Sequence, residues 1–194
     1  MRAFVIAMPS EADAVRPALG ADDRLYVCGI GKVNAAAVTQ KAIDEGATEI
    51  LNAGLCGGFG PRVKVGECYE VKSAVEYDFD LAKLNGTRIG QHDERQTPYF
   101  DLKTTGRYIS CILATGDHFN DSEVDYQLIT EELGAELRDM EGAAIAHVCE
   151  KNAIPLRSLK CVTNVAGQGS MTGQYQTNIA RCLECLKNAV ISWK

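Results

Sequence analysis

The stretch Arg138-Asp139-Met140-Glu141-Gly142-Ala143-Ala144 places carboxylates at a turn between a short strand and an apolar helix. Residues 135–137 have the character of a strand end, and the apolar residues after Glu141 recur at the spacing of a buried helical face. A carboxylate at such a turn can bind a polar ligand. It can also simply stabilise the helix N-terminus, by about 0.3–1 kcal/mol, and the stretch taken alone favours that role.

Short apolar strands alternate with helical patterns on both sides of this turn. The hydrophobic spacing predicts strands over residues 3–8, 25–28, 49–53, 68–75, 108–114 and 156–162. It predicts helices near residues 11–19, 32–45, 122–133, 141–152 and 177–191. Helices that alternate with strands pack on the faces of a sheet, so the pattern predicts an α/β layer sandwich. We expect one domain over residues 1–194, with residues 85–100 as a polar loop.

The composition indicates a compact chain and argues against two classes of partner. At 194 residues, 46% hydrophobic and 24% charged, the chain can bury a core, and it contains no apolar run long enough to span a bilayer. Its net charge of -6, without a dense cluster of Lys and Arg, argues against nucleic-acid binding. The first strand meets Pro9 and Glu11 too soon for a secretory signal, so we expect a cytoplasmic protein.

The cysteines and histidines show no metal-ligand spacing. The eight cysteines are scattered through predicted core segments, where reduced thiols behave as small hydrophobes. Cys182 and Cys185 are closely spaced, but neither a second cysteine pair nor a neighbouring histidine completes a zinc site. His92, His118 and His147 are likewise without ligand spacing, and His147 is expected to be a packing residue. We therefore expect no metal and no organic cofactor.

Two glycine-rich turns follow predicted strands, at Gly29-Ile30-Gly31 and at Gly54-Leu55-Cys56-Gly57-Gly58. Open α/β sheets bind ligands where strands end, because exposed backbone amides and helix N-termini converge there. Neither turn completes the Gly-x-Gly-x-x-Gly pattern of a dinucleotide site. The glycines can also serve tight turning alone. The turns therefore favour a ligand other than a dinucleotide.

Met140-Glu141-Gly142-Ala143-Ala144 resembles the Met-Glu-x-x-Ala signature of the methylthioadenosine/S-adenosylhomocysteine nucleosidases, a family within the nucleoside phosphorylase superfamily. Other stretches are similar to that family's loops and occur in its order: Ala7-Met8-Pro9-Ser10-Glu11, Gly29-Ile30-Gly31-Lys32-Val33, Asn52-Ala53-Gly54-Leu55-Cys56-Gly57-Gly58, Thr115-Gly116-Asp117-His118-Phe119 and Thr163-Asn164-Val165-Ala166. The resemblance covers nearly the whole chain, apart from a divergent middle over residues 76–107. It implies a three-layer α/β/α sandwich with a central mixed sheet, and a homodimer.

The resemblance implies roles for several residues in the hydrolysis of a nucleoside. Glu11 would be the general base that polarises a water for attack on the anomeric carbon of the ribose. Glu141 would accept hydrogen bonds from the ribose hydroxyls, and Met140 would pack along the sugar. Phe119 would stack on the purine, with the backbone at Asn120 near the base edge. From the residues alone, Glu11 could merely start a helix and Phe119 could be an ordinary core residue.

Three residues depart from the pattern of the adenine-specific enzymes. Asn164, which we count as catalytic, stands where those enzymes typically have an aspartate that protonates N7 of the leaving purine. Its amide can instead donate to an oxygen at purine position six while its carbonyl accepts from protonated N7. Leu55, beside Gly54 in the turn, replaces a serine expected to hold the water, and Lys160 replaces an arginine, keeping the charge without the planar fork of donors. We count Gly54, Leu55 and Lys160 as substrate-binding residues.

We predict a purine nucleosidase that hydrolyses the N-glycosidic bond of a 6-oxopurine nucleoside, such as inosine, guanosine or futalosine, to free base and sugar. Base departure is expected to precede water attack, so that Glu141 and Glu11 stabilise an oxocarbenium-like centre. The alternatives are an adenine-specific methylthioadenosine/S-adenosylhomocysteine nucleosidase, a phosphate-dependent phosphorylase and an inactive nucleoside-binding protein. Residues 85–100, residues 167–175 or a partner subunit would close the side of the ribose 5′ group.

Overall fold

A computed structural model describes residues 1–92, 94–119 and 122–194 of the chain. It contains eight strands in these described residues: β1 (Arg2–Ile6), β2 (Asp23–Val27), β3 (Glu49–Gly58), β4 (Cys68–Glu76), β5 (Phe100–Asp101), β6 (Ser110–Thr115), β7 (Leu137–Asp139) and β8 (Leu156–Val165). The α-helices are α1 (Pro9–Val15), α2 (Lys32–Asp44), α3 (Ala82–Asn85), α4 (Glu123–Gln127), α5 (Gly142–Lys151) and α6 (Met171–Trp193). A 3₁₀ turn (Arg16–Ala18) follows α1, and a π-helical turn (Leu128–Glu132) follows α4.

The sheet is mixed, and five of its strands curl into a closed ring in which each strand pairs with the next. β3 pairs with β8 in parallel, and β8 pairs with β4 antiparallel. β4 pairs with β6 and β6 with β7, both in parallel, and β7 pairs antiparallel with β3. Strands β1 and β2 extend the sheet from β3 in parallel, and β5 adds to β4. On β3, pairing with β1 reaches Asn52 and pairing with β7 starts at Gly57. The residues between these two partners therefore lie at an opening in the sheet.

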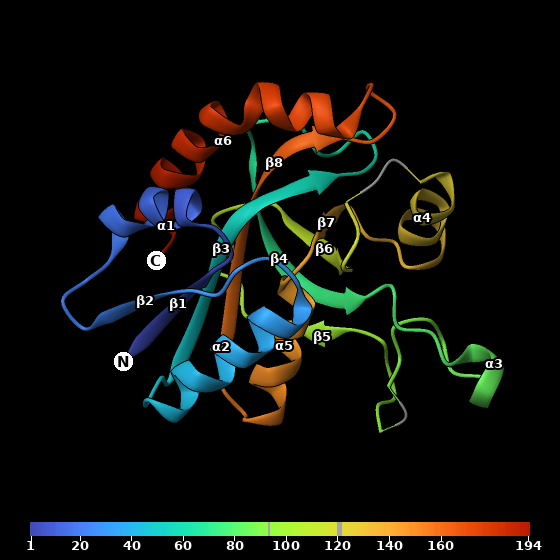
Figure 1. The fold of residues 1–194 in the computed structure, drawn as a ribbon, viewed down its shortest axis with the longest axis horizontal. Helices are drawn as coiled ribbons and strands as arrows, with labels where there is room; N and C mark the ends of the chain where they lie inside the picture. The colour runs from blue at the N-terminus through green and yellow to red at the C-terminus, as the bar shows by residue number, and fades with distance from the viewer. Residues whose placement is uncertain (93, 120–121) are drawn as a thin grey trace.

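Helices cover both faces of this sheet, as Figure 1 shows. α1 and α6 pack on one face, around a core that includes Phe4, Leu51, Leu186 and Trp193. α2 and α5 pack on the other face, around a second core with Ile50, Ile145 and residues of both helices. Each helix contributes small or aliphatic side chains at helical spacing, which is how an amphipathic helix buries one stripe. The predicted three-layer α/β/α sandwich with a central mixed sheet is confirmed.

Several predicted boundaries differ from the observed ones. β3 runs five residues beyond its predicted end and carries the second glycine-rich turn within the strand. The helix predicted over residues 122–133 divides into α4 and a π-helical turn. The last helix starts at Met171, six residues earlier than predicted, because the Ser170 hydroxyl accepts a hydrogen bond from the Gly173 amide at 3.2 Å. Residues 171–175, within the stretch expected to close the ribose 5′ side, are therefore helical.

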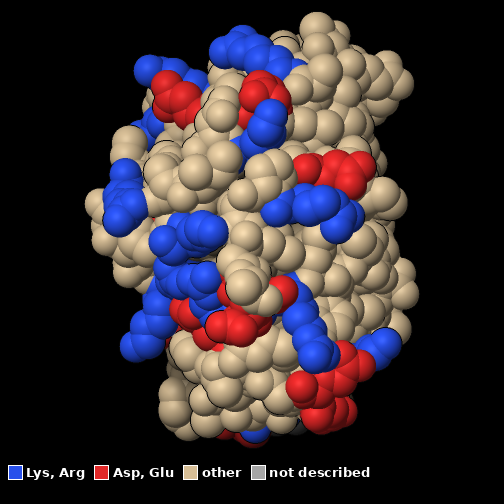
Figure 2. Space-filling view, turned by 90° about the vertical axis from the view of Figure 1, so that its left-hand side faces the viewer, with Lys and Arg blue, Asp and Glu red and all other residues tan. Residues whose placement is uncertain are grey.

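The surface carries both signs of charge. On the face shown in Figure 2, Lys and Arg side chains lie among Asp and Glu side chains. Mixed charge of this kind does not form the continuous basic footprint of a polynucleotide site. Within the described ranges, no helix has both the length and the apolar character that crossing a membrane requires.

Candidate active site

A cavity of about 390 Å³ opens at the gap in the sheet beside β3. Its wall gathers residues that lie far apart in the sequence: the end of β1, the start of α1, the second half of β3, the β7–α5 turn, the end of β8 and the first turns of α6. Of the predicted site residues, the cavity is lined by Glu11, Leu55, Phe119, Met140, Glu141 and Asn164. Gly54 and Lys160 are not among the lining residues, and Asn120 lies outside the described residues.

Glu11 is held at the cavity by two backbone amides. The Met8 amide donates to its Oε2 at 3.1 Å, and the Leu55 amide donates to its Oε1 at 2.7 Å. The first of these bonds is a capping interaction at the start of α1, so the helix-starting role and the ligand-facing position coexist. Burial raises the pKa of the Glu11 carboxyl, although the Leu55 amide and the charge of Lys160 oppose the shift. The carboxylate is thus buried, oriented and more basic than usual.

Gly54 matters to Glu11 through the space it leaves. A Cβ atom at position 54 would lie 2.8 Å from Glu11 Oε1, which is closer than side chains tolerate. Any larger residue would push the carboxylate out of its position under β3. Gly54 therefore shapes the site without lining the cavity.

Glu141 is the residue at which α5 begins, and its side chain faces the cavity. Its Oε1 accepts a hydrogen bond from the Gly31 amide at 2.9 Å, across a loop that Gly31 forms with φ of 101°. Burial raises the pKa of Glu141 to about 7, and the nearby charge of Asp139 adds to this shift. Near neutral pH the carboxylate is therefore poised between its protonated and ionised forms.

Asp139, two residues before Glu141, is compensated on every side. Lys160 Nζ lies 2.8 Å from its Oδ2, the Thr115 hydroxyl donates to Oδ1 at 2.6 Å, and the Gly142 amide donates to the same carboxylate at 2.9 Å. Asp139 thus stabilises the N-terminus of α5, a role that the sequence allowed for both Asp139 and Glu141. Burial alone would lower the pKa of Lys160, but Asp139, Glu141 and Glu11 outweigh it and raise the pKa, so the ammonium stays charged.

The position of Lys160 corrects one prediction. The sequence placed Lys160 among the substrate-binding residues, but its side chain is 2% exposed and serves as the counterion of Asp139. No pattern near Lys160 indicates this, because its partner lies on another strand, 21 positions away in the chain. The cation therefore neutralises a buried acid and is not presented to the cavity.

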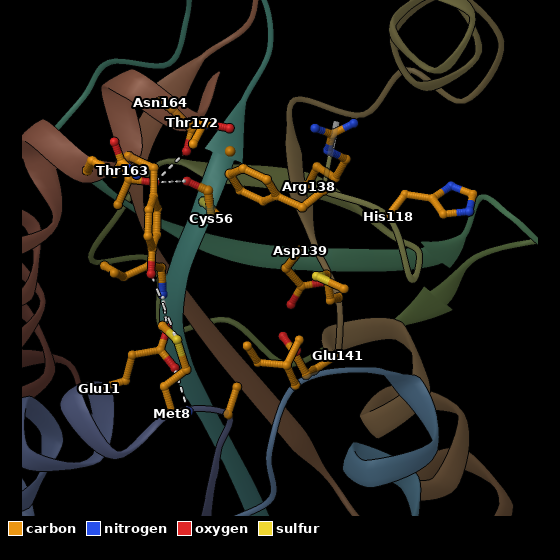
Figure 3. A pocket seen from close by; sticks show the side chains of 18 residues that line it. Met8, Glu11, Cys56, His118, Arg138, Asp139, Glu141, Thr163, Asn164 and Thr172 are labelled. Carbon is orange, nitrogen blue, oxygen red and sulfur yellow. Dashed lines mark hydrogen bonds between the residues drawn. The ribbon is translucent and has the colours of Figure 1, made fainter. Parts of the chain in front are cut away.

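Asn164 lies at the other end of the cavity from Glu11 and Glu141 (Figure 3). Its Oδ1 lies 2.5 Å from the Thr163 hydroxyl, and its Nδ2 lies 3.1 Å from Met171 Sδ. A hydroxyl beside Oδ1 fixes the amide so that its NH₂ group points toward Met171, whose thioether is only a weak acceptor. The NH₂ group consequently keeps donor capacity for a ligand. Neither Thr163 nor Met171 was identified from the sequence.

Aromatic side chains form the outer part of the cavity. Phe119 is 50% exposed, and its ring meets Tyr175 of α6 edge to face, with ring centroids 5.8 Å apart. The Tyr175 hydroxyl points toward Met8 Sδ at 3.8 Å. A half-exposed phenylalanine at a cavity is available to stack on a flat ligand, which a core phenylalanine is not. The structure thus brings Tyr175 into the site.

This chain is similar to known proteins in both its sequence and its fold. The family model of the phosphorylase superfamily matches residues 20–191. The 5'-methylthioadenosine/S-adenosylhomocysteine nucleosidase of Treponema pallidum is 30% identical, over 77% of this chain and 69% of its own. The 5'-methylthioadenosine nucleosidase of Arabidopsis thaliana is 31% identical, over 90% of this chain and 67% of its own. A putative nucleosidase of that type from Borrelia burgdorferi, bound to adenine, superimposes with a TM-score of 0.87 at 23% identity, covering 98% of both chains.

Proposed function

This chain belongs to the phosphorylase superfamily, and we propose that it is a nucleosidase, which hydrolyses the N-glycosidic bond of a purine nucleoside. The observation that carries the proposal is the pair of buried carboxylates, Glu11 and Glu141, which face one cavity and are held by backbone amides. Asn164 at the opposite end of that cavity offers a donor for the base. The sugar would therefore lie at the carboxylate end and the purine at the amide end.

Glu141 would hold the ribose. Its Oε1 accepts one amide hydrogen bond, which leaves further acceptor sites on the carboxylate for the sugar hydroxyls. As the bond to the base breaks, positive charge develops at the anomeric carbon, and a buried carboxylate nearby stabilises that charge strongly because little water screens it. Met140, which also lines the cavity, would pack against the sugar ring.

Glu11 would activate the water. Each of its oxygens accepts one backbone N–H and retains a lone-pair site for a bound water. The electron pair of the N-glycosidic bond leaves with the purine, and when the water then attacks the anomeric carbon, its proton passes to Glu11. The raised pKa of Glu11 makes the carboxylate a better proton acceptor.

The charges of the site favour water over phosphate as the attacking group. Phosphate at the anomeric carbon would lie beside the Glu11 carboxylate, and like charges repel at that distance. Lys160, the cation that a phosphorylase could use there, is committed to Asp139. The carboxylate of Glu11 and the pairing of Lys160 with Asp139 therefore support hydrolysis over phosphorolysis.

The relatives named above change the order of the candidate substrates. The sequence alone put a 6-oxopurine nucleoside first because of Asn164, whereas both relatives are named for methylthioadenosine. We therefore propose a 5′-substituted adenine nucleoside of the methylthioadenosine type as the first candidate. The fixed amide supports it, since the NH₂ group of Asn164, held toward the weak acceptor Met171 Sδ, keeps donor capacity for the unprotonated N7 of adenine.

A 6-oxopurine nucleoside is the second candidate substrate, because the amide of Asn164 supports it. An amide cannot protonate N7, so adenine would have to take its proton from solvent, whereas hypoxanthine or guanine can accept the NH₂ hydrogen bond at the position-six oxygen. Thr163 occupies one acceptor site of the Asn164 carbonyl and leaves a second for a protonated N7.

Incubation of the purified protein with methylthioadenosine, inosine, guanosine and futalosine, with and without phosphate, tests the proposal. Chromatography would identify both the base and the sugar product. Free adenine with unphosphorylated methylthioribose supports the first candidate, and free hypoxanthine or guanine supports the second. A sugar phosphate would make the chain a phosphorylase. Tight binding with no base release would overturn the assignment of a catalyst.

We also propose that the chain forms a homodimer at the mouth of the cavity. Ile30 and Phe119 line the cavity yet are 52% and 50% exposed, and Val33 on the first turn of α2 is 79% exposed. Exposed apolar side chains gathered beside a ligand site are typical of a surface that another protein covers. Light scattering on the eluting protein would give the mass directly, and a monomer at micromolar concentration would rule the dimer out.

A further inference from the structure

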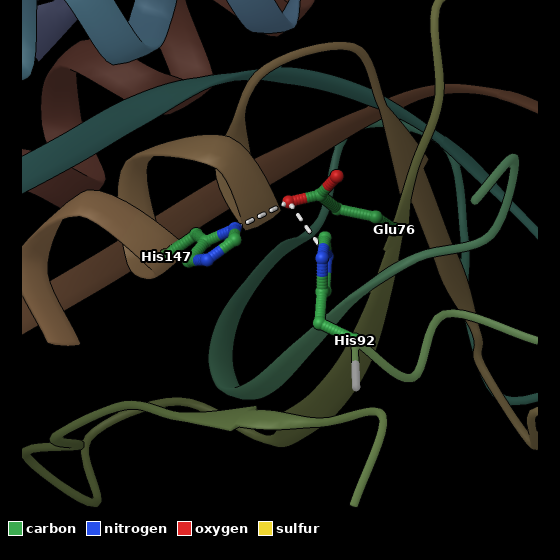
Figure 4. Close-up of side chains that lie close together, drawn as sticks. All are labelled: Glu76, His92 and His147. Atoms are coloured by element: carbon green, nitrogen blue, oxygen red, sulfur yellow. Dashed lines mark hydrogen bonds and ion pairs between the residues drawn. The ribbon is translucent and has the colours of Figure 1, made fainter. Parts of the chain in front are cut away.

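Three side chains from separate elements meet outside the cavity already described (Figure 4). Glu76 ends β4, His92 belongs to the segment between α3 and β5, and His147 lies on α5. Each offers one ligand atom, and these atoms all lie within 4.8 Å of one another. His147 Nδ1 is 3.1 Å from Glu76 Oε1, and His92 Nε2 is 3.8 Å from the same oxygen. This is a His₂Glu set with mixed nitrogen and oxygen donors.

Both imidazoles carry a buried nitrogen that no protein group satisfies. His92 Nε2 and His147 Nε2 are buried and have no hydrogen-bond partner within the described part of the chain. Buried polar atoms are almost always paired, so two such atoms on adjacent rings call for an explanation. The ring centroids are 4.5 Å apart, which brings the two rings within reach of one small ligand. A metal ion takes up imidazole lone pairs of this kind.

Aromatic neighbours fix the orientation of the two rings. His92 stacks on Phe79 with a centroid distance of 3.9 Å, and His147 stacks on Phe100 with a centroid distance of 4.8 Å. Phe100 also carries the Arg95 guanidinium on its face, at 4.0 Å from the ring centroid. Held rings need little reorganisation before they can ligate an ion, and preorganisation of this kind is what a binding site requires.

The local charges leave room for a cation. Lys32 Nζ lies 2.6 Å from Asp78 Oδ1 and 3.8 Å from Glu76 Oε2, so one lysine is shared between two carboxylates. Two carboxylates against one lysine leave a net negative charge.

We propose that Glu76, His92 and His147 form a site for a Zn²⁺-like divalent transition-metal ion. Imidazole nitrogens with one carboxylate suit Zn²⁺ and its neighbours, whereas Mg²⁺ and Ca²⁺ prefer oxygen ligands alone. Ligand distances of about 2.0–2.2 Å require the rings and the carboxylate to close around the ion by small side-chain rotations. A fourth position would be filled by water.

The ion would have a structural role. None of its three ligands lines the cavity, so it would not touch the nucleoside. It would instead tie the segment that holds His92 to β4 and to α5, the helix that begins at Glu141. A metal that joins three elements stabilises the folded state by its binding free energy, because the unfolded chain does not present the site.

Zn²⁺ binding to the chelator-treated protein tests the proposal directly. Titration against a chromophoric chelator is expected to give one tightly bound Zn²⁺ per chain, with Mg²⁺ unable to compete. Glu76→Gln, His92→Gln and His147→Gln should each weaken Zn²⁺ binding by about tenfold or more. Glu94→Gln is the matched control, since Glu94 lies in the same segment as His92 but pairs with Lys151 at the surface. Circular dichroism in chelator would show that each variant is folded.

The eight cysteines require a second control, because thiols also bind Zn²⁺. Cys185→Ser removes a half-buried thiol and should leave the affinity unchanged. With Co²⁺ as the probe, ligation by nitrogen and oxygen would lack the strong near-ultraviolet absorption of a thiolate complex. Equal Zn²⁺ affinity in a His92→Gln/His147→Gln double variant would overturn the proposal, as would the absence of stoichiometric binding to the unmodified protein. Nucleoside hydrolysis in the presence of chelator is measured separately, so failure of one proposal leaves the other intact.

Discussion

Two groups of buried charge lie side by side in this protein and are compensated in different ways. Asp139 has a full cation, a hydroxyl and a helix-starting amide as partners. Among the described residues, the hydrogen bonds to the carboxylates of Glu11 and Glu141 come from backbone amides, and both carboxylates face a cavity. A buried carboxylate with a charged partner has its electrostatic needs met by the fold, whereas one held by amides retains capacity for a ligand. The difference separates residues that support the site from residues that act in it.

Replacement of Glu11 should produce the largest change in activity. Glu11→Gln preserves the shape of the side chain but cannot accept a proton, so kcat/KM should fall by about 10³-fold, within the usual range for loss of a general base. The free energy of unfolding should change by no more than about 1–2 kcal/mol, because most of the local hydrogen bonding remains possible. Steady-state kinetics and urea unfolding measure the two effects. Loss of stability in place of activity would place Glu11 with Asp139.

Replacement of Lys160 should have the opposite balance of effects, with a large loss of stability. Lys160→Met leaves the buried Asp139 carboxylate without its cation, and breaking a buried pair from one side costs about 3–5 kcal/mol of unfolding free energy. Lys187→Met is the matched control, because Lys187 pairs with Glu184 at the surface and should cost no more than about 0.5 kcal/mol. Urea unfolding of both variants gives the comparison. An unfolding free energy equal to that of the control would show that Lys160 is not needed by the fold.

Replacement of Glu141 should reduce activity less than replacement of Glu11. Glu141→Gln keeps a hydrogen-bonding group at the ribose but removes the charge that stabilises the oxocarbenium-like centre, so kcat/KM should fall by about 10²-fold. The Gly31 amide can still bond to the side-chain carbonyl, and the variant should stay folded. Unchanged kcat/KM with every nucleoside substrate would remove Glu141 from the mechanism.

The pH dependence gives a smaller effect with a defined sign. Glu141 binds ribose hydroxyls as an acceptor when ionised, and its pKa is raised from 4.5 to about 7. The kcat/KM should therefore rise with pH up to about 7, by about tenfold per unit in the acid limb, and Glu141→Gln should lack this limb. Because the folded-state pKa is the higher one, the folded state binds the proton more tightly. Stability from this group is then lost as pH rises from 4.5 to about 7.

Local patterns in the sequence predicted the fold, and they indicated several residues that the structure gathers around one cavity. The strand-to-helix turn at Glu141, the turn at Gly29-Ile30-Gly31 and the first turn of α1 at Glu11 are encoded by neighbouring residues, and the structure places them at one cavity. Residues 54–58, predicted as a turn, are instead the end of β3. The partners of Lys160, His92 and His147 are set by the tertiary fold, and no spacing in the chain reveals them. The early start of α6 depended on one capping hydroxyl, at Ser170, followed by residues that are typical of a loop.

The smallest predicted effect concerns the base end, where a single side chain decides between two substrates. Asn164→Asp would place a group that can be protonated beside the Thr163 hydroxyl and Met171, in the surroundings that now orient the amide. A protonated carboxyl can give its proton to N7, so the ratio of kcat/KM for methylthioadenosine to that for inosine should rise by about tenfold, the worth of one good hydrogen bond. Asn152→Asp, outside the cavity, serves as the control and should leave the ratio unchanged. A fall in the ratio of kcat/KM for methylthioadenosine to that for inosine would show that the Asn164 amide itself suits adenine. The polar groups at the base end of the cavity would then be like Asp139, whose partners are supplied by the fold.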